Sequence, residues 1–267
     1  MADYETVNVH RRDGAATIEL NRPDRLNAWN GQFGKDLLAA IQEVGGDDDV
    51  RAVLVTGAGR AFSSGADLKD MGEDDPKTPD GRPDVYKVLT ERYHPIITGL
   101  RHMPKPVVAA VNGPAVGIGC SLALACDLIV AKRSAYLLLA FVNVGLVPDG
   151  GSSVFIPARV GHTRAFEMAL LGERVDAETA ERWGLVNRVY EDDEFESKTA
   201  ELMDRLAAGP TRSYAGTKRQ LNNRIYWGLD EQLELEAQIQ REMAGTDDFI
   251  EGVMAFVQKR DPRYSGS

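Results

Sequence analysis

The feature that most constrains the fold of this chain is a pair of glycine-rich turns, each placed directly after a short β-branched segment. "RAVLVTG" at residues 51–57 precedes "GRAFSSGADLKDM" at 59–71, and "PVVAAVN" at 106–112 precedes "GPAVGIG", which leads into the apolar "CSLALACD". Segments rich in valine favour strands. A strand, a turn and a helix that return to another strand, "LIVA" at 128–131, form a parallel crossover. The sequence therefore predicts an α/β core.

Other segments complete the predicted organisation of that core. Residues 4–10 and 15–20 have the pattern of a β-hairpin around "RRDG". Helices are expected at 32–44 and 84–102, and a short helix is expected near Ala66. From residue 150 onward the pattern is mainly helical.

The chain is predicted to divide into an α/β core at 1–200 and a helical C-terminal region at 201–267. One C-terminal stretch carries apolar residues at helical spacing: Phe249, Val253, Phe256 and Val257. The segment "GEDDPKTPDGRPD" at 72–84 has five acidic residues and three prolines, so we expect an exposed, mobile loop there.

The composition argues against several classes of protein. Acidic side chains outnumber basic ones 41 to 31, and the formal net charge of −10 disfavours nucleic acid or an anionic membrane as the main partner. The two cysteines, Cys120 and Cys126, would point apart on a helix, so we expect no disulfide and a reducing compartment. The N-terminus has no apolar signal core, and no apolar run reaches the roughly 18 residues of a membrane span. We expect a cytoplasmic protein that binds no membrane.

The two glycine turns have a shared chemical use. Each can point backbone N–H groups outward, and a helix N-terminus adds partial positive charge. Two such donors aimed at one oxygen would stabilise an oxyanion or enolate, and removing one donor costs about 3 kcal/mol.

Alternative roles for these turns fit less well. "GPAVGIG" has Leu122 where a dinucleotide fingerprint needs its third glycine, and no glycine loop is followed by the G-K-[ST] of a P-loop. "AFSSG" has Ala61 in place of the leading glycine of a serine elbow. We therefore interpret Ser63 and Ser64 as turn residues rather than nucleophiles.

The stretch "GLVPDGGSS" at 145–153 places one carboxylate, Asp149, at the end of an apolar run. Pro-Asp-Gly is ordinary turn chemistry. The second interpretation is a base whose proton affinity is raised by dry surroundings. The stretch alone leaves both interpretations open and favours the turn.

Six motifs together indicate a family. They are "LNRPDRLNA", "GRAFSSGADLKDM", "VNGPAVGIGCSLALACDLIVA", "GLVPDGGSSVFIPARVG", "AERWGLVNRVY" and "DDFIEGVMAFVQKRDPRYSG". Their order and spacing over nearly the whole chain resemble the crotonase family, the enoyl-CoA hydratases and isomerases. The resemblance implies a crotonase (ClpP-like) spiral of ββα units with a C-terminal helical trimerisation region, assembled as a homotrimer or as a hexamer, a dimer of trimers. It also implies an acyl-CoA thioester substrate, with no cofactor beyond the coenzyme A that is part of that substrate.

The resemblance assigns the catalytic residues by position. The two N–H donors to the thioester oxygen fall on Ala66, directly after Gly65, and on Ile118, directly after Gly117. Many family members have glycine or alanine in place of Ile118, but a backbone donor needs only a residue other than proline. The isoleucine side chain is expected to narrow the pocket.

The carboxylates indicate the branch of the family. Where hydratases carry two glutamates, this chain has Ser121 and Phe141, and neither can serve as an acid near neutral pH. Asp149 falls where the isomerase branch carries its single Glu or Asp, and the ring-epoxide isomerase of phenylacetate breakdown has a similar Pro-Asp loop. One carboxylate is enough to move a proton from C2 to C4 of a 3-enoyl thioester. Burial is expected to raise the pKa of Asp149 above its reference of about 3.9.

The resemblance also implies a set of substrate-binding residues: Arg25, Leu26, Ala28, Ser64, Gly65, Asp67, Leu68, Lys69, Gly117, Ser121, Phe141, Phe256 and Lys259. Arg25 and Lys69 lie on loops that the family uses near adenine and phosphate. Phe256 and Lys259 match positions that reach a neighbouring subunit's ligand in relatives. For the cations, a solvated face is an equally good interpretation, and Asp67 is expected to bond loop N–H groups.

Three alternatives to an isomerase stay open. A hydratase would need an acid from elsewhere, such as Glu91 or the 72–84 loop. A dehalogenase would use Asp149 as a nucleophile, together with aromatic and histidine partners. A catalytically silent acyl-CoA binder is the third. His10, His94, His102 and His162 lack metal-ligand spacing, so we expect no metal site and assign these histidines surface or packing roles.

Overall fold

The structure is a computed structural model that describes residues 4–69, 76–79 and 81–267; part of the 72–84 segment thus lies outside the described residues. Its strands are β1 (Val7–Arg12), β2 (Ala15–Leu20), β3 (Ala52–Gly57), β4 (Val107–Val111), β5 (Ala115–Val116), β6 (Leu128–Lys132), β7 (Tyr136–Leu138), β8 (Val175–Asp176) and β9 (Arg188–Tyr190). Its helices are η1 (Pro23–Arg25), α1 (Gly31–Gly46), α2 (Val85–Val88), η2 (Leu89–Tyr93), α3 (His94–His102), α4 (Ile118–Ala125), η3 (Val142–Val144), α5 (Ser152–Leu171), α6 (Ala177–Trp183), α7 (Phe195–Ala208), α8 (Thr211–Ile225), α9 (Leu229–Ala244) and α10 (Asp247–Gln258).

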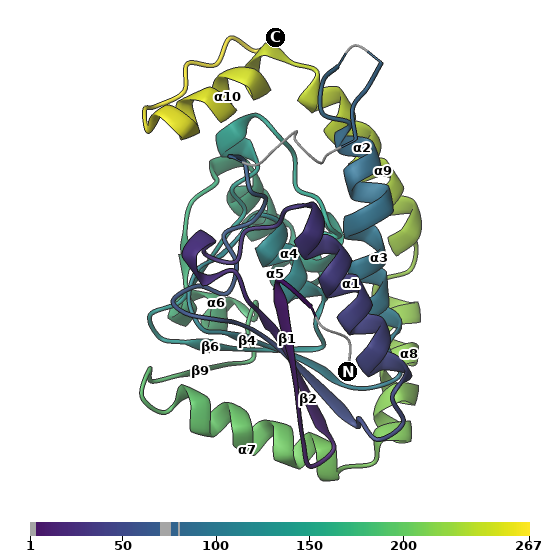
Figure 1. Ribbon diagram of the computed structural model, residues 1–267. Helices are drawn as coiled ribbons and strands as arrows, with labels where there is room; N and C mark the ends of the chain where they lie inside the picture. Colours follow the sequence, from purple (N-terminus) through teal and green to yellow (C-terminus); the bar gives the residue numbers. More distant parts are fainter. Residues whose placement is uncertain (1–3, 70–75, 80) are drawn as a thin grey trace.

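A six-stranded sheet in the order β1-β2-β3-β4-β6-β9 forms the centre of the molecule (Figure 1). The expected hairpin is confirmed: β1 and β2 are antiparallel, and Asp13 and Gly14 turn the chain with φ angles of 50° and 80°. Both positive φ angles fit a two-residue hairpin turn. The other neighbours in the sheet are parallel, which confirms the predicted crossovers and the α/β class.

Both faces of this sheet are covered by helices. On β3, Val53 and Val55 belong to the main core, whereas Ala52 and Leu54 pack in a second cluster with residues of α7. Successive strand residues point to opposite faces, so one short apolar strand serves both layers. In Figure 1, α7 lies on one side of the sheet, and α1, α4 and α5 lie on the other.

The helix predicted over 84–102 is present but interrupted. The π-helical turn η2 joins α2 to α3, and the N–H of His94 donates to the Leu89 carbonyl five residues back. Pro95 follows directly and has no N–H to offer the Glu91 carbonyl. The wider π-helical turn thus accommodates a proline, which has no N–H, inside a helical segment.

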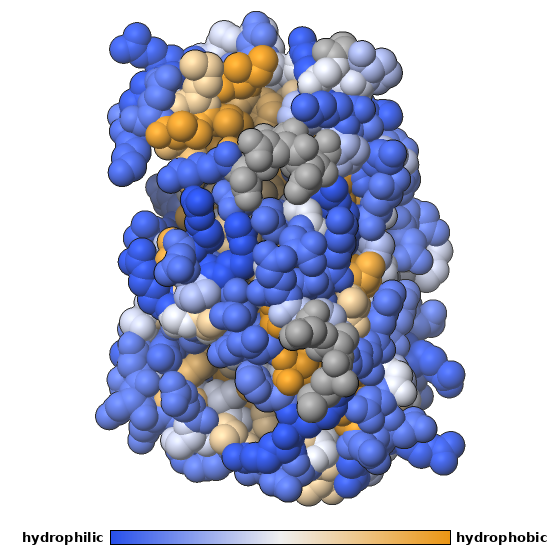
Figure 2. Space-filling model, viewed as in Figure 1, coloured by the Kyte–Doolittle hydropathy of each residue, from blue (hydrophilic) through white to orange (hydrophobic). Residues whose placement is uncertain are grey.

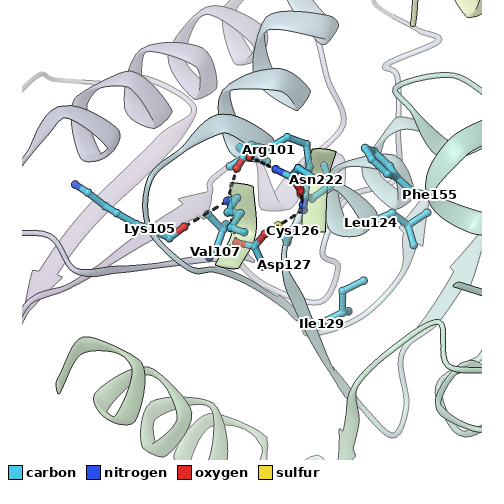
Figure 3. A network of polar contacts seen from close by, with 12 residues as sticks. Arg101, Lys105, Val107, Leu124, Cys126, Asp127, Ile129, Phe155 and Asn222 are labelled. Atoms are coloured by element: carbon cyan, nitrogen blue, oxygen red, sulfur yellow. Dashed lines mark hydrogen bonds and ion pairs between the residues drawn. The ribbon is translucent and has the colours of Figure 1, made fainter. Parts of the chain in front are cut away.

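A buried polar network ties α3, β4, α4 and α8 together (Figure 3). The Asp127 carboxylate lies 3.1 Å from Arg101 and 2.8 Å from Lys218, and it accepts a hydrogen bond from the Val107 N–H at 2.9 Å. Arg101 also donates to the Ala125 carbonyl at the end of α4. Burial lowers the pKa of Lys218, so this ammonium depends on Asp127 for its charge. The network holds the C-terminal end of α4 in place. The N-terminal end of the same helix belongs to the site described below.

The helix α10 folds back over the body of its own chain. A Cβ atom on Gly252 would lie 2.6 Å from the Val144 Cα, so helix and η3 backbone touch directly. Figure 2 shows apolar side chains gathered over α10, which is drawn at the upper left of Figure 1. The exposed ones include Ile250, Met254 and Val257. A patch of this kind is typical of a contact surface, and the trimer or hexamer stays a prediction.

One expectation about local structure is wrong, one is confirmed, and one is untested. The described residues around Ala66 contain no short helix; Ala66 instead pairs with Trp29 in an isolated β-bridge, which holds its backbone extended. The region after residue 150 is mainly helical, as predicted; its strands are the short β8 and β9, and β9 extends the main sheet. The predicted boundary at residue 200 falls inside α7, and the division into two regions stays a prediction. Cys120 and Cys126 are free and buried, as expected.

Candidate active site

A cavity of about 440 Å³ lies beside the N-terminal end of α4. Its walls come from the two glycine turns, from α2 and η2, from the segment after β7, and from single residues of α9 and α10. Eleven of the predicted site residues line it: Leu26, Ser64, Gly65, Ala66, Asp67, Leu68, Gly117, Ile118, Phe141, Asp149 and Phe256. The structure thus brings together residues from six separate stretches of the sequence.

Five predicted residues do not line this cavity. Arg25, Lys69 and Lys259 are exposed, and Ala28 is buried with its carbonyl accepting a hydrogen bond from Arg22. Ser121 is buried under the cavity floor. Their roles in substrate binding stay predictions, as does the expected contact of Phe256 and Lys259 with a neighbouring subunit's ligand. Within its own chain, Phe256 lies on the cavity wall.

The two glycine turns meet edge to edge. The Val116 N–H donates to the Ser63 carbonyl at 2.9 Å. Gly65 has φ +90°, and a Cβ atom on it would lie 2.9 Å from the Val116 carbonyl oxygen. Gly117 has φ +55°, and a Cβ atom on it would lie 4.0 Å from the Gly65 Cα. The close approach at Gly65 leaves no room for a side chain, and the positive φ angles at both positions favour glycine.

This contact places the next two backbone N–H groups at one wall of the cavity. Ile118 is the first residue of α4, where N–H groups lack intrahelical partners and the helix dipole is positive. Ala66 follows Gly65 directly. Among the hydrogen bonds of the described residues, none is donated by the N–H of Ala66 or of Ile118. Both residues line the cavity, and their N–H groups are not used by the hydrogen bonds of the described backbone.

Asp149 proves to be both a turn residue and a buried carboxylate. Gly150 and Gly151 have φ angles of 61° and 80°, and they turn the chain into α5. The main-chain carbonyl of Asp149 accepts hydrogen bonds from the hydroxyls of Ser121 at 2.7 Å and Ser152 at 2.8 Å. Its side chain, on the cavity wall, is only 4% exposed. The two interpretations left open by the sequence are therefore compatible.

The surroundings of Asp149 favour its protonated form. Burial raises the pKa of Asp149 to about 8, the negative charge of Glu236 adds to the rise, and a hydrogen bond from Gln240 opposes it. The Oδ2 atom accepts that bond at 2.8 Å, and the buried Oδ1 atom has no partner. A carboxylate that loses its solvation in this way is a stronger base.

Glu236 is a second buried carboxyl group close to this loop. It accepts hydrogen bonds from the Gly151 N–H at 2.8 Å and from the Ser153 hydroxyl at 2.5 Å. Burial raises its pKa to about 7, although these donors oppose the rise. Glu236 does not line the cavity, so its contacts hold the loop rather than a ligand.

The remaining acids and histidines are placed less favourably for chemistry. Asp67 lines the cavity but lies 3.1 Å from the guanidinium of Arg22. Glu91, considered above as a substitute acid, is exposed and pairs with Lys87 on the same helical stretch. Burial lowers the pKa of His94 to about 4, and this residue is not part of the cavity wall. Within the described ranges, no three His, Cys, Asp or Glu side chains gather as metal ligands would.

Several cavity residues were not predicted from the sequence. They are Trp29, Leu89, Tyr93, Phe249 as a wall residue, and Gln240. Trp29 sits one residue beyond the recognised "LNRPDRLNA" motif, and Phe249 was noted only as part of an apolar stripe. Gln240 carried no local signal, because it is 91 residues from Asp149 in the sequence.

No helix in the described part of the chain combines the length and apolar character that crossing a membrane requires.

Known proteins resemble this chain over nearly its whole length. Residues 10–267 match the family model described as enoyl-CoA hydratase/isomerase. A 1,2-epoxyphenylacetyl-CoA isomerase of Escherichia coli K12 is 39% identical over 262 residues, covering 98% of this chain and 99% of that protein. A Rhodobacter capsulatus protein named "Probable enoyl-CoA hydratase" is 39% identical over 263 residues, covering 98% and 99%. The crystal structure of an enoyl-CoA hydratase from Mycobacterium avium subsp. paratuberculosis superposes with a TM-score of 0.89 at 37% identity, covering 98% of this chain and all of that one.

Proposed function

The chain belongs to the enoyl-CoA hydratase/isomerase family, with the fold of ββα units and helical C-terminal region that its motifs indicated, and we propose that it shifts a double bond within an enoyl-CoA. The family acts on acyl-CoA thioesters. The observation that carries the proposal is the state of the acidic side chains on the cavity wall. Of the two acids on it among the described residues, Asp67 is ion-paired, and Asp149 is the dry carboxylate without a cationic partner.

The first step is the binding of the thioester. Its carbonyl oxygen accepts hydrogen bonds from the N–H groups of Ala66 and Ile118, at the positive end of α4. As C2 loses a proton, negative charge develops on this oxygen. Because the donors are fixed by backbone geometry, they stabilise that charge strongly, and each is worth about 3 kcal/mol.

The second step is proton transfer by Asp149. The carboxylate takes a proton from C2 of the 3-enoyl group, and the electron pair of that C–H bond enters a dienolate held by the two donors. The same carboxyl group then returns the proton to C4. The double bond moves from C3–C4 to C2–C3, into conjugation with the thioester. No second acid or base is required, because the proton lost and the proton gained are equivalent.

The same site is poorly equipped to add water. Hydration needs one group to activate water and another to deliver a proton. Phe141 contributes an apolar wall, and the hydroxyl of Ser121 is bonded to the main chain of Asp149. Neither position supplies the second carboxyl group of a hydratase.

The direct test is a spectrophotometric assay with 3-enoyl-CoA, in which conjugation increases the absorbance. The wild-type protein is expected to turn over the substrate, and Asp149→Asn, which keeps the size of the side chain, is expected to lose nearly all activity. Normal turnover by Asp149→Asn would remove Asp149 from the mechanism. Incorporation of labelled solvent oxygen into crotonyl-CoA product would favour a hydratase, and tight binding without turnover would favour a silent acyl-CoA binder.

The aromatic wall of the cavity favours a second candidate within the same chemistry. Trp29, Tyr93, Phe141, Phe249 and Phe256 all line it. Aromatic side chains pack well against flat rings, and one relative is named as an isomerase of an epoxyphenylacetyl-CoA. A ring-bearing acyl group is therefore the alternative substrate. Comparing kcat/KM for straight-chain and ring-bearing acyl-CoA thioesters separates the two candidates.

A further inference from the structure

One face of α9 carries three polar side chains spaced four residues apart, and they contact the loop that holds Asp149 or the first turn of α5, which follows it. Gln232 donates to the Ser153 hydroxyl at 3.0 Å, and Glu236 accepts from the backbone of Gly151. Gln240, two turns beyond Gln232, reaches Asp149 itself. Residues at i, i+4 and i+8 lie on one side of a helix, so this stripe is a continuous polar support inside the core.

Gln240 binds the loop through both ends of its amide. Its Nε2 donates to Asp149 Oδ2 at 2.8 Å, and its Oε1 accepts from the Val147 N–H at 3.1 Å. The side chain is 0% exposed. A flip of the amide would lose both hydrogen bonds at once, so the amide and the carboxylate hold each other in one orientation.

We propose that Gln240 is the positioning residue for the base: it anchors Oδ2 of Asp149 and thereby leaves Oδ1 as the atom that takes and returns the proton. This inference rests on the proposed isomerase function. It deepens that function by assigning different tasks to the two carboxylate oxygens. Oδ1 is the buried oxygen without a hydrogen-bond partner, as a proton acceptor should be before substrate arrives.

The amide also adjusts how strongly the carboxylate holds its proton. A donor to the charged form favours that form, whereas burial and the charge of Glu236 on the same helix oppose it. In the described residues, Glu236 is the charged group that acts on Asp149. Removing the Gln240 donor is therefore expected to raise the titration midpoint of Asp149 by about one pH unit.

The test is a carboxyl ¹³C NMR titration of full-length protein labelled at aspartate, with Asp149→Asn identifying the signal. Gln240→Met keeps the size of the side chain but removes the donor, and it should raise the Asp149 midpoint by about one pH unit. Gln232→Met, on the same helix face but in contact with Ser153, is the matched control and should leave the midpoint unchanged. An unchanged midpoint in folded Gln240→Met overturns the inference.

A second variant, Gln240→Asn, keeps the inference testable if Gln240→Met does not fold. Gln240→Asn keeps an amide but is one methylene too short to reach Oδ2, and it carries the same expectation and the same refutation. With 3-enoyl-CoA, Gln240→Met should lower kcat more than it changes KM, because it disturbs the base and leaves the two N–H donors of the thioester oxygen in place. The titration needs no substrate. Absence of isomerase activity in the wild-type protein would thus refute the proposed function. An unshifted Asp149 midpoint in Gln240→Met would refute the role of Gln240.

Discussion

The burial of Asp149 predicts that the wild-type protein loses stability as the pH rises, relative to the variant Asp149→Asn. The pKa of this carboxyl group is about 8 in the folded protein, against 3.8 for the exposed group. Below pH 3.8 the group is protonated in both states, and its contribution to stability is fully present. At higher pH the unfolded chain releases the proton while the folded protein keeps it, so stability is lost until the folded group also ionises near pH 8.

The magnitude follows from the two pKa values. Each pH unit between them lowers the free energy of unfolding by about 1.4 kcal/mol. Between pH 5 and pH 8.5, about three of these units are crossed, which corresponds to a loss of about 4 kcal/mol. Asparagine does not ionise, so the variant avoids this loss. Its own constant penalty, from an amide group placed where Oδ1 has no partner, is the same at both pH values.

The measurement is urea denaturation of both proteins at pH 5 and pH 8.5, at a single protein concentration because self-association would shift the midpoints. We expect the difference in unfolding free energy between wild type and variant to move by about 4 kcal/mol in favour of the variant. Parallel pH dependences would show that Asp149 titrates in the folded protein as it does in water. The physical basis of the proposed mechanism would then be wrong, whatever the protein binds.

Three further predictions concern the site and its support. The kcat/KM for 3-enoyl-CoA should rise about tenfold per pH unit up to about pH 8 and then level off, since the ionised form of Asp149 is the base; a profile that falls over this range would contradict this. Gly65→Ala should lower kcat by about tenfold or more, because its Cβ atom would lie 2.9 Å from the Val116 carbonyl, whereas Gly81→Ala, at a similar φ but with nothing within 4 Å, should leave kcat unchanged. Asp127→Asn should lower the free energy of unfolding by about 3–5 kcal/mol in urea, because Arg101 and Lys218 would stay buried without their counter-ion. The surface variant Asp204→Asn, which loses only an exposed ion pair with Arg12, is its control and should leave the urea midpoint nearly unchanged.

The parts of the site that the sequence predicted are those with local chemical signatures. Gly65 and Gly117 were recognisable because strand-to-turn junctions of this kind favour glycine, which adopts positive φ angles readily and, at Gly65, permits close backbone approach. Asp149 was recognisable because it lies between an apolar run and two glycines, at the position in the ordered motifs to which the family resemblance assigns a single carboxylate. These signals lie within a few residues of the groups they describe.

The parts that the sequence did not predict depend on contacts between distant segments. Glu236 and Gln240 lie in "LDEQLELEAQIQREMA", where polar residues four apart are typical of the solvent face of an amphipathic helix. Only the packing of α9 against the loop before α5 buries that face. The short helix expected near Ala66 failed for a related reason, since pairing with Trp29, 37 residues earlier, holds the backbone extended.

The distribution of hydrogen bonds around Asp149 explains how a carboxylate can be both firmly held and strongly basic. A carboxylate that accepts two or three N–H bonds can have a pKa below about 2 and is a weak base. Here the N–H groups of Gly151 and Ser153 donate to Glu236, and the serine hydroxyls beneath the loop donate to the main-chain carbonyl of Asp149. The loop is thus fixed through its backbone, and the carboxylate itself keeps one donor, from Gln240. Because the loop is held mainly through its backbone, the side chain accepts few hydrogen bonds and retains the high proton affinity that the proposed removal of a C2 proton requires.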